Sequence, residues 1–199
     1  MKIELKSLVP HAIALLVFLV FSAGYFHPVM FEGKQLKQSD VKQYQGAAKE
    51  ITDYRMMNGD EALWTNGMFS GMPAYQISMM HEGNWMNKAA TIMRLGLNAP
   101  VGVMFLTMLG FYILGMCLRI NPWVTMVGAI AFGFASFNIL YLGAGHITKV
   151  NAVSFMAPTL GGLLLATRGK WLWGSVVFAF FVSLNISANH LQITNKEEE

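Results

Sequence analysis

The sequence is short of charge. Asp, Glu, Lys and Arg make up 13% of its 199 residues, whereas a typical soluble domain has about a quarter. The single cysteine, Cys117, excludes an internal disulfide, and there is no Cys/His spacing typical of a zinc site. The net charge of +3 is small and scattered, which argues against a nucleic-acid partner. Hydrophobic residues instead make up 54% of the chain.

Long apolar runs account for this composition, and none of them contains Asp, Glu, Lys or Arg. The runs predict an all-α integral membrane protein with about five transmembrane helices: residues 8–25, 100–118, 123–142, 152–167 and 171–186. The first run could also be a cleaved signal peptide, since small residues follow its apolar core, but its length favours a retained helix. Without charges inside the runs, an ion or proton pathway is disfavoured.

The runs divide the chain into four parts. We predict a first transmembrane helix in residues 1–26, an extracytoplasmic loop with amphipathic helices in residues 27–98, a four-helix membrane region in residues 99–194 and a charged tail in residues 195–199.

The short loops predict the orientation, because cytoplasmic loops are rich in Lys and Arg. With a cytoplasmic N-terminus, most loop cations fall inside, and Lys149 and Lys196 fall outside: Lys2, Lys6, Arg119, Arg168 and Lys170 are the inner ones. The three polar segments, residues 26–98, 143–151 and 187–194, then share the outer face. The orientation thus predicts a multi-pass membrane protein with a cytoplasmic N-terminus.

The long polar segment itself is expected to be folded. Apolar residues recur every three or four positions in residues 35–55 and 85–95, which predicts two helices. The second would lie in the membrane interface with its apolar face towards the lipid. Between them, residues 60–76 (DEALWTNGMFSGMPAYQ) gather aromatic and apolar side chains around turn residues. Such a loop is expected to pack against the membrane or to cover a site.

Asp40 is the candidate catalytic residue in this segment. Its carboxylate could act as a general base, taking a proton from an acceptor hydroxyl, or could hold a divalent metal that grips a phosphate. The alternative is structural: Ser39 or Asp40 could cap the amino end of the predicted helix. Which metal, if any, the protein uses is not specified by the sequence.

Other candidates would bind substrate. His146 and Lys149, three residues apart, could neutralise a phosphate, or could simply meet water and lipid headgroups. His190 ends the last run and could line the same outer site or cap its helix. Aromatic and amide side chains of the long loop could contact a sugar, or could form the loop's own core: Tyr44, Trp64, Asn66 and Tyr75. We expect the loop and the outer ends of the later helices to form one site.

Four stretches, taken in order, carry a family resemblance: SDVKQYQGAAKEI, LWTNGMFSGMPAYQI, AGHITKVNAVSFMAPTLGG and ANHLQIT. They resemble the N-terminal region of the YfhO family of bacterial membrane proteins, over residues 2–194, and the resemblance implies a location in the bacterial inner (plasma) membrane. Members of that family are several times longer, so the resemblance implies that this chain is a fragment and that residues 195–199 are an unrelated tail.

The resemblance implies a GT-C-like fold, the helical membrane architecture of glycosyltransferases that use polyprenyl-phosphate-linked sugars. It implies transfer of a sugar to a cell-envelope polymer such as a teichoic acid, with membrane lipid as the surroundings of the site. It also implies a catalytic acid in the first outer loop, for which Asp40 is the matching residue. The alternative function is a non-catalytic membrane scaffold or transport component whose outer loop binds a partner.

Overall fold

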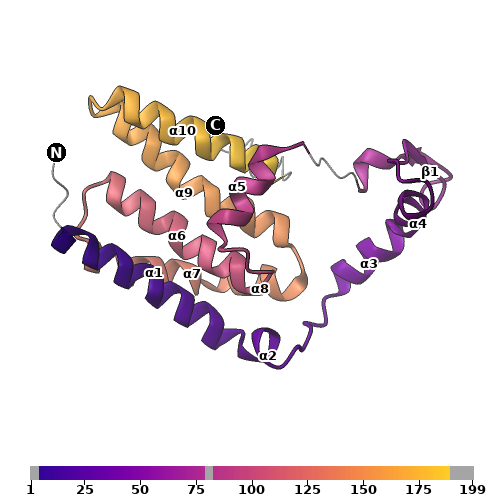
Figure 1. Cartoon of the computed structure of the whole chain (residues 1–199), viewed down its shortest axis with the longest axis horizontal. Coiled ribbons are helices and arrows are strands. Elements are labelled where there is room, and N and C mark those ends of the chain that lie inside the picture. The colour runs from indigo at the N-terminus through magenta and orange to yellow at the C-terminus, as the bar shows by residue number, and fades with distance from the viewer. Residues whose placement is uncertain (1–4, 79–82, 189–199) are drawn as a thin grey trace. The chain divides into compact units, whose positions relative to one another are not determined.

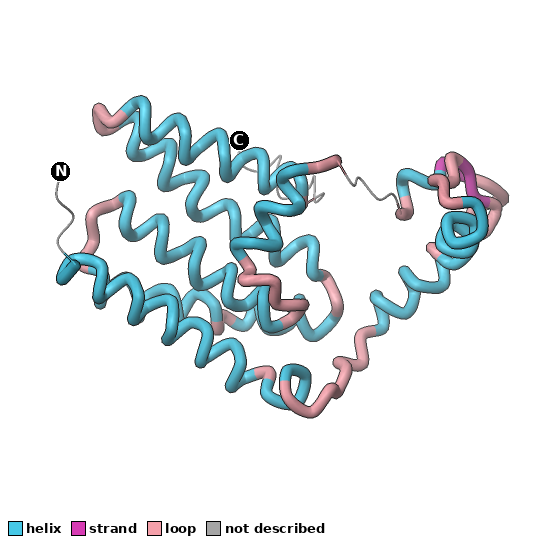
Figure 2. The backbone as a smooth tube through the Cα atoms, viewed as in Figure 1, coloured by secondary structure: helices cyan, strands magenta, loops and turns pink. Residues whose placement is uncertain are grey.

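The computed structural model describes residues 5–78 and 83–188 and divides them into two compact units. The first unit is formed by the chain up to Leu36 and from Trp85 onward, and the second by Lys37–Asn84. Both are predominantly helical, as Figures 1 and 2 show. The expectation of an all-α protein is therefore confirmed for the described residues, apart from one very short strand pair.

The first unit is a bundle of apolar helices, and from here on we call it the helical unit. Its elements in chain order are α1 (Leu5–Tyr25), α2 (His27–Met30), α5 (Trp85–Met93), α6 (Val101–Cys117), α7 (Pro122–Gly133), α8 (Ser136–Ala144), α9 (Ile147–Thr167) and α10 (Trp171–Ser187).

Helix α9 lies between α6 and α10 (Figure 1) and approaches both closely. A Cβ atom at Gly110 of α6 would overlap the Ser154 carbonyl of α9, and one at Gly174 of α10 would overlap the Ala166 backbone. Small residues at such contacts let helix backbones meet, which is how helices associate where lipid replaces water.

Buried polar groups add to the same contacts. Thr107 of α6 and Ser154 of α9 are hydrogen-bonded through their hydroxyls at 2.7 Å. Asn185 of α10 donates its side-chain amide to the Ala152 carbonyl of α9 at 3.0 Å. Because each group is buried and has a partner, these bonds fix the register of the three helices.

Helix α1 packs against the other side of α6. Phe18, which is fully buried, meets the Tyr112 ring edge-on at 5.6 Å between ring centroids. His11 lies two turns earlier on α1, and its Nδ1 is 2.8 Å from the Tyr112 hydroxyl. One tyrosine of α6 thus connects two positions of the first helix.

The third apolar run differs from the single helix expected over residues 123–142. It forms α7 and α8, bent by 44° at Phe134 and Ala135. The side-chain amide of Asn138, which is buried, donates to the Phe132 carbonyl at 2.7 Å. That bond satisfies a carbonyl that the broken helix leaves without its usual partner.

The polar link expected over residues 143–151 is also shorter than predicted. Helix α8 runs to Ala144, Gly145 adopts a left-handed conformation (φ 102°), and α9 begins at Ile147. Lys149 and Asn151 are therefore helical, and the fourth apolar run starts earlier than residue 152. Glycine ends α8 because it accepts positive φ without a steric penalty.

Two of the helices are long and apolar enough to cross a membrane, Ser7–Tyr25 of α1 and all of α9, and the bent pair of α7 and α8 gives a third if it counts as one span. Helices α6 and α10 are apolar but have 17 residues each, the lower end of the range of about 17–25 that spans a bilayer. The structure thus supports two to three membrane-spanning helices, and the number five stays a prediction.

Helix α5 corresponds to the amphipathic helix expected over residues 85–95, although it ends at Met93. It packs on α10: Met86, Ala89 and Met93 contact the buried cluster that contains Phe181 and Leu184. Ser187 of α10 also donates to the Asn87 side-chain oxygen at 2.8 Å. The apolar face of α5 is therefore covered by protein rather than only by lipid.

The second unit, Lys37–Asn84, is called the polar unit below. Its elements are α3 (Ser39–Ala47), α4 (Lys49–Asn58), β1 (Trp64–Thr65), β2 (Met72–Pro73) and the 3₁₀ turn η1 (Ala74–Gln76). Ile51, Ala62 and Ala74 form its small buried core, with Ile77 packed against them. A separate core makes this segment a folded unit and not an extended linker.

One helix was expected over residues 35–55, and the structure has two. The break is at Ala48, which is buried and has ψ near −2°. Gly46 precedes it, and glycine weakens a helix through the entropy that it loses. The Ala48 carbonyl accepts from both the amide and the hydroxyl of Thr52, at 2.9 and 2.8 Å, so α4 starts directly after the break.

The helix contacts give a testable prediction. A leucine at Gly174 must push α10 away from α9, and overpacking of this kind costs about 1–3 kcal/mol. We expect Gly174→Leu to lower the melting temperature in detergent by several degrees, since about 1 kcal/mol corresponds to roughly 2–4 °C at this chain length.

Gly24→Leu is the matched control, because Gly24 lies in helix α1 and a Cβ atom there would have nothing within 4 Å. It should melt close to the unmodified protein. Equal melting temperatures for all three proteins would contradict the close contact between α9 and α10.

Candidate functional sites

Asp40 lies in the first turn of α3, not at its cap. The N-cap residue is Gln38, and no side chain caps this helix end, so the prediction that Ser39 or Asp40 caps the helix is wrong. Ser39 instead donates its hydroxyl to the Asp40 carboxylate at 3.2 Å. A carboxylate in the first turn is stabilised by the positive end of the helix dipole.

A groove of about 380 Å³ runs between α3 and α4 of the polar unit. Tyr44 lines it and donates its hydroxyl to Ser78 at 3.2 Å. Lys49 and Asp53, paired at 2.7 Å, form another part of the wall together with Arg55. An aromatic ring beside charged donors and a carboxylate suits a ligand with both an apolar face and hydroxyl groups. Asp40 is not among the lining residues.

Glu50 of α4 is a residue that the sequence did not point to. One carboxylate oxygen accepts three hydrogen bonds, from the Thr65 hydroxyl at 2.5 Å and from the backbone amides of Asn66 and Gly67 at 2.9 Å each. The bond from Thr65, followed by those amides, lowers the pKa of the Glu50 carboxyl although desolvation opposes this. Glu50 thereby ties the loop that carries Asn66 to helix α4.

Trp64 and Asn66 are brought together in that loop, where the indole Nε1 donates to the Asn66 side-chain oxygen at 3.2 Å. β1 and β2 pair antiparallel, with Trp64 opposite Pro73. Gly71 has φ of 121°, and a Cβ there would come within 2.9 Å of the Trp64 ring. Glycine is therefore required both for its backbone conformation and for space. Tyr75 is exposed on the 3₁₀ turn that follows.

Arg55 and Glu61 form an ion pair across this unit at 2.7 Å, and both side chains are largely covered. The hydrogen bond that Arg55 donates to Glu61 raises the pKa of Arg55. Asp53 pairs with Lys49 on its own helix, at 2.7 Å. The Arg55 pair joins α4 to the segment that leads into β1, and Asp60 between them is exposed.

In the helical unit, His146 and Lys149 meet at the amino end of α9. His146 is the N-cap residue and Lys149 lies in the first turn. The Lys149 ammonium is 3.9 Å from the centroid of the Tyr141 ring. The centroids of the His146 and Tyr141 rings are 5.4 Å apart. Phe137 is a second aromatic neighbour of Lys149, at 5.9 Å. His146 and Lys149 thus both contact the Tyr141 ring, a contact that their spacing in the sequence did not predict.

The charge at this end of α9 is positive. The Lys149 ammonium group and the helix dipole both favour an anion. Within residues 5–36 and 83–188 the only carboxylate is Glu32, which is paired with Lys34 at 2.6 Å. The pair of His146 and Lys149 is therefore suited to a phosphate group.

His190 lies outside the described residues. No group of three or more His, Cys, Asp or Glu residues is placed to hold a metal ion within residues 5–78 and 83–188. The described candidates belong to two units: Asp40, Tyr44, Trp64, Asn66 and Tyr75 to the polar unit, and His146 and Lys149 to the helical unit.

Fold and candidate sites together define a helical membrane protein with a folded polar insert. No protein-family model, no curated protein and no solved structure matches this chain. The resemblance to the YfhO family and the GT-C-like fold stay predictions from the sequence.

The hydrogen bonds of Glu50 predict a dependence on pH. Because its folded pKa is lowered, the carboxylate stabilises the loop above the ordinary pKa of glutamate, and this stabilisation is lost as the pH falls through the lowered value. Hydrogen exchange of the Asn66 and Gly67 amides, corrected for intrinsic rates, should accelerate over that interval.

At neutral pH, Glu50→Gln should accelerate the same two amides severalfold, since a neutral amide oxygen accepts more weakly. Asp53→Asn is the control, because Asp53 pairs with exposed Lys49 on its own helix. Unchanged protection in Glu50→Gln would contradict the role of Glu50.

Proposed function

We propose that this chain is the N-terminal part of a GT-C-like membrane glycosyltransferase. The enzyme would move a sugar from a polyprenyl-phosphate donor to a cell-envelope acceptor on the outer face of the membrane. The observation that carries the proposal is the folded polar unit, Lys37–Asn84, inserted in the chain between apolar helix α1 and the remaining apolar helices. A first outer loop with its own helices is what the family resemblance implies.

Asp40 is the proposed general base. Its carboxylate would take the proton from the acceptor hydroxyl as that oxygen attacks the anomeric carbon and the phosphate leaves. Its place in the first turn of α3, with Ser39 as a hydrogen-bond donor, favours the negative charge that a base requires. A divalent metal at Asp40 is the alternative role for the same carboxylate.

The leaving group in this reaction is a lipid phosphate, which gains negative charge as the sugar departs. His146 and Lys149 at the amino end of α9 are the proposed stabilising groups. The Tyr141 ring attracts the Lys149 ammonium group through a cation–π contact but leaves its charge unneutralised. His190 would join them, as the sequence predicts.

The sugar or acceptor would be held by the polar unit. The groove beside Tyr44 offers an aromatic ring together with the Asp53 carboxylate and the Arg55 guanidinium. Trp64, Asn66 and Tyr75 lie in and after the loop that Glu50 holds to α4. These residues are proposed to shape the substrate pocket.

Substitution of Asp40 tests the proposal. In lipid vesicles with labelled polyprenyl-phosphate sugars, Asp40→Asn should lower transfer by a factor of about 10²–10⁴, the usual contribution of a general base. Expression and melting temperature should be unchanged, since the Asp40 side chain is only partly buried.

Asp60→Asn is the matched control, an exposed acid of the same unit outside the proposed site. It should retain full transfer. Near-normal turnover of Asp40→Asn would remove Asp40 from the mechanism.

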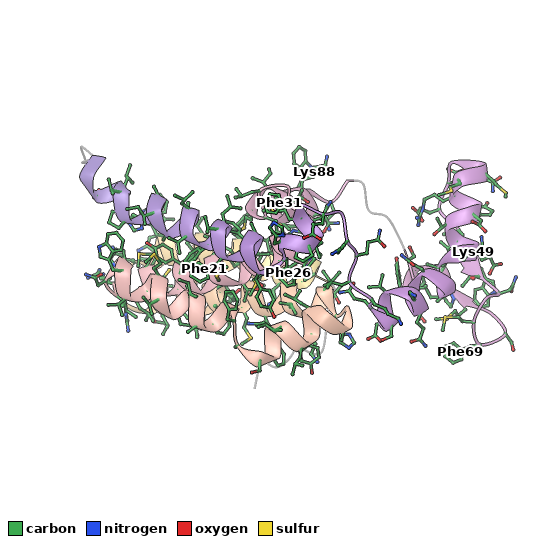
Figure 3. The ribbon with its side chains drawn as sticks, turned by 90° about the horizontal axis from the view of Figure 1, so that it is seen from below. Phe21, Phe26, Phe31, Lys49, Phe69 and Lys88 are labelled. Carbon is green, nitrogen blue, oxygen red and sulfur yellow. The ribbon has the colours of Figure 1, made fainter. Side chains whose placement is uncertain are left out.

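A second candidate function, a non-catalytic scaffold, is favoured by one observation. The polar unit exposes four large apolar side chains by more than three quarters of their surface: Met56, Met57, Leu63 and Phe69. Phe69 lies at the edge of the unit and points outward (Figure 3). Apolar residues that are exposed in this way can mark a contact with a partner protein.

The scaffold function makes a different prediction. Met57→Glu with Phe69→Glu should abolish a complex seen on native gels of solubilised membranes, whereas Asp40→Asn should leave it intact. If the complex persists in both Met57→Glu with Phe69→Glu and Asp40→Asn, the scaffold function is contradicted.

A further inference from the structure

A groove of about 440 Å³ lies at one end of the helical unit, between α1, α6 and α9. Its walls are almost entirely apolar and include Leu15, Leu109, Ile113 and Leu165. Its size falls within the range of about 300–1,000 Å³ that is common for small-molecule sites. The groove is open to the outside of the bundle and is formed by helices that are apolar enough to sit in a membrane.

Two cations complete this groove, Arg119 and Lys170. Arg119 follows α6 and Lys170 precedes α10, and Figure 1 shows both turns at the end of the bundle where α1 begins. Both side chains are exposed. Glu32, the one carboxylate described in this unit, comes after α2, past the opposite end of α1. Among the described residues, the groove thus has an apolar interior and a positively charged mouth.

The backbone at the mouth is held in place. α6 and α9 end in the same motif, in which the last amides bond back to the carbonyls of the final turn: Ile120 to Gly115 at 3.0 Å, and Lys170 to Leu165 at 3.2 Å. α9 has Gly169 at the left-handed position of this motif, whereas α6 has Arg119 there with φ of 60°. Arg119 therefore occupies a position where glycine is usually preferred, and the two turns have the same backbone form.

A polar pair lies deeper in the same groove. The Tyr112 hydroxyl and His11 Nδ1 are 2.8 Å apart and both residues line the wall. Tyr112 precedes Arg119 by two helical turns, about 10 Å along the α6 axis. The groove thus has two cations at its mouth and a polar pair about two helical turns further in, both set in an otherwise apolar wall.

We propose that this groove binds an anionic glycerophospholipid. The lipid phosphate would lie between Arg119 and Lys170, its glycerol ester groups near Tyr112 and His11, and one acyl chain along Leu15, Leu109 and Ile113. Basic pockets between membrane helices bind anionic headgroups in this way. The lining residues include neither Asp40 nor His146 and Lys149, so the proposal does not depend on the proposed transferase activity.

Native mass spectrometry of the full chain released from detergent tests the proposal. Phosphatidylglycerol should remain bound at least about tenfold more strongly than phosphatidylcholine with the same acyl chains, since each cation near a headgroup contributes to binding. Arg119→Gly should lower this preference severalfold, and Arg119→Gly with Lys170→Gln should abolish it. Glycine suits the left-handed position, so Arg119→Gly should keep the melting temperature.

Arg168→Gln is the matched control, because Arg168 lies at the same end of the bundle and does not line the groove. It should keep the preference for phosphatidylglycerol. In Leu15→Trp the larger side chain would fill the groove from an exposed position, so the binding of both phosphatidylglycerol and phosphatidylcholine should weaken.

Three results would overturn the proposal. One is equal retention of the two lipids, and another is an equal loss of preference in Arg168→Gln. The third is displacement of phosphatidylglycerol by glycerol phosphate at the same affinity, which would indicate a site for a free anion rather than for a lipid.

Discussion

The helical unit depends on the close approach of α9 to both α6 and α10. In a membrane, apolar side chains gain little from contact with one another, so helices associate through tight packing and through hydrogen bonds. Gly110 and Gly174 make room for the α9 backbone, and the bonds of Ser154 and of the Ala152 carbonyl fix its position along its neighbours. Because α9 is fixed in this way, so are its two ends. His146 and Lys149 lie at its start, and the turn to α10 at its other end places Lys170 in the groove between α1, α6 and α9.

Much of the helical unit could be predicted from the sequence, because a long run without charge has few alternatives to a membrane helix. The bend at Phe134 and Ala135 was not predicted, although Gly133 and Ser136 flank it and weaken a helix there. The bond from the Asn138 amide to the Phe132 carbonyl required the structure. The start of α9 was also missed. Lys149 and Asn151 look like loop residues, but at a helix end near the membrane surface they are equally suited to a first turn.

The polar unit was predictable as a folded segment but not in its details. The periodicity of residues 35–55 indicated one helix. Gly46 weakens that helix, but the pattern did not locate the break at Ala48, which is buried in the structure. The contact of Glu50 with Thr65 and Gly67 joins residues 15 and 17 positions apart, a distance that no local pattern covers. For the candidate sites, the spacing of His146 and Lys149 identified the pair, whereas Tyr141 and Phe137 behind Lys149 required the structure.

The proposed enzyme requires that Asp40 and His146 face the same side of the bilayer, because a base and a leaving-group site cannot cooperate across a membrane. The most direct test is labelling of single cysteines, placed by Asp40→Cys or His146→Cys in a Cys117→Ser background, with a membrane-impermeant maleimide on intact cells. We expect both to be labelled from outside, and Arg168→Cys to be labelled only after the cells are permeabilised. Labelling of Asp40→Cys and His146→Cys from opposite sides would contradict the proposed enzyme.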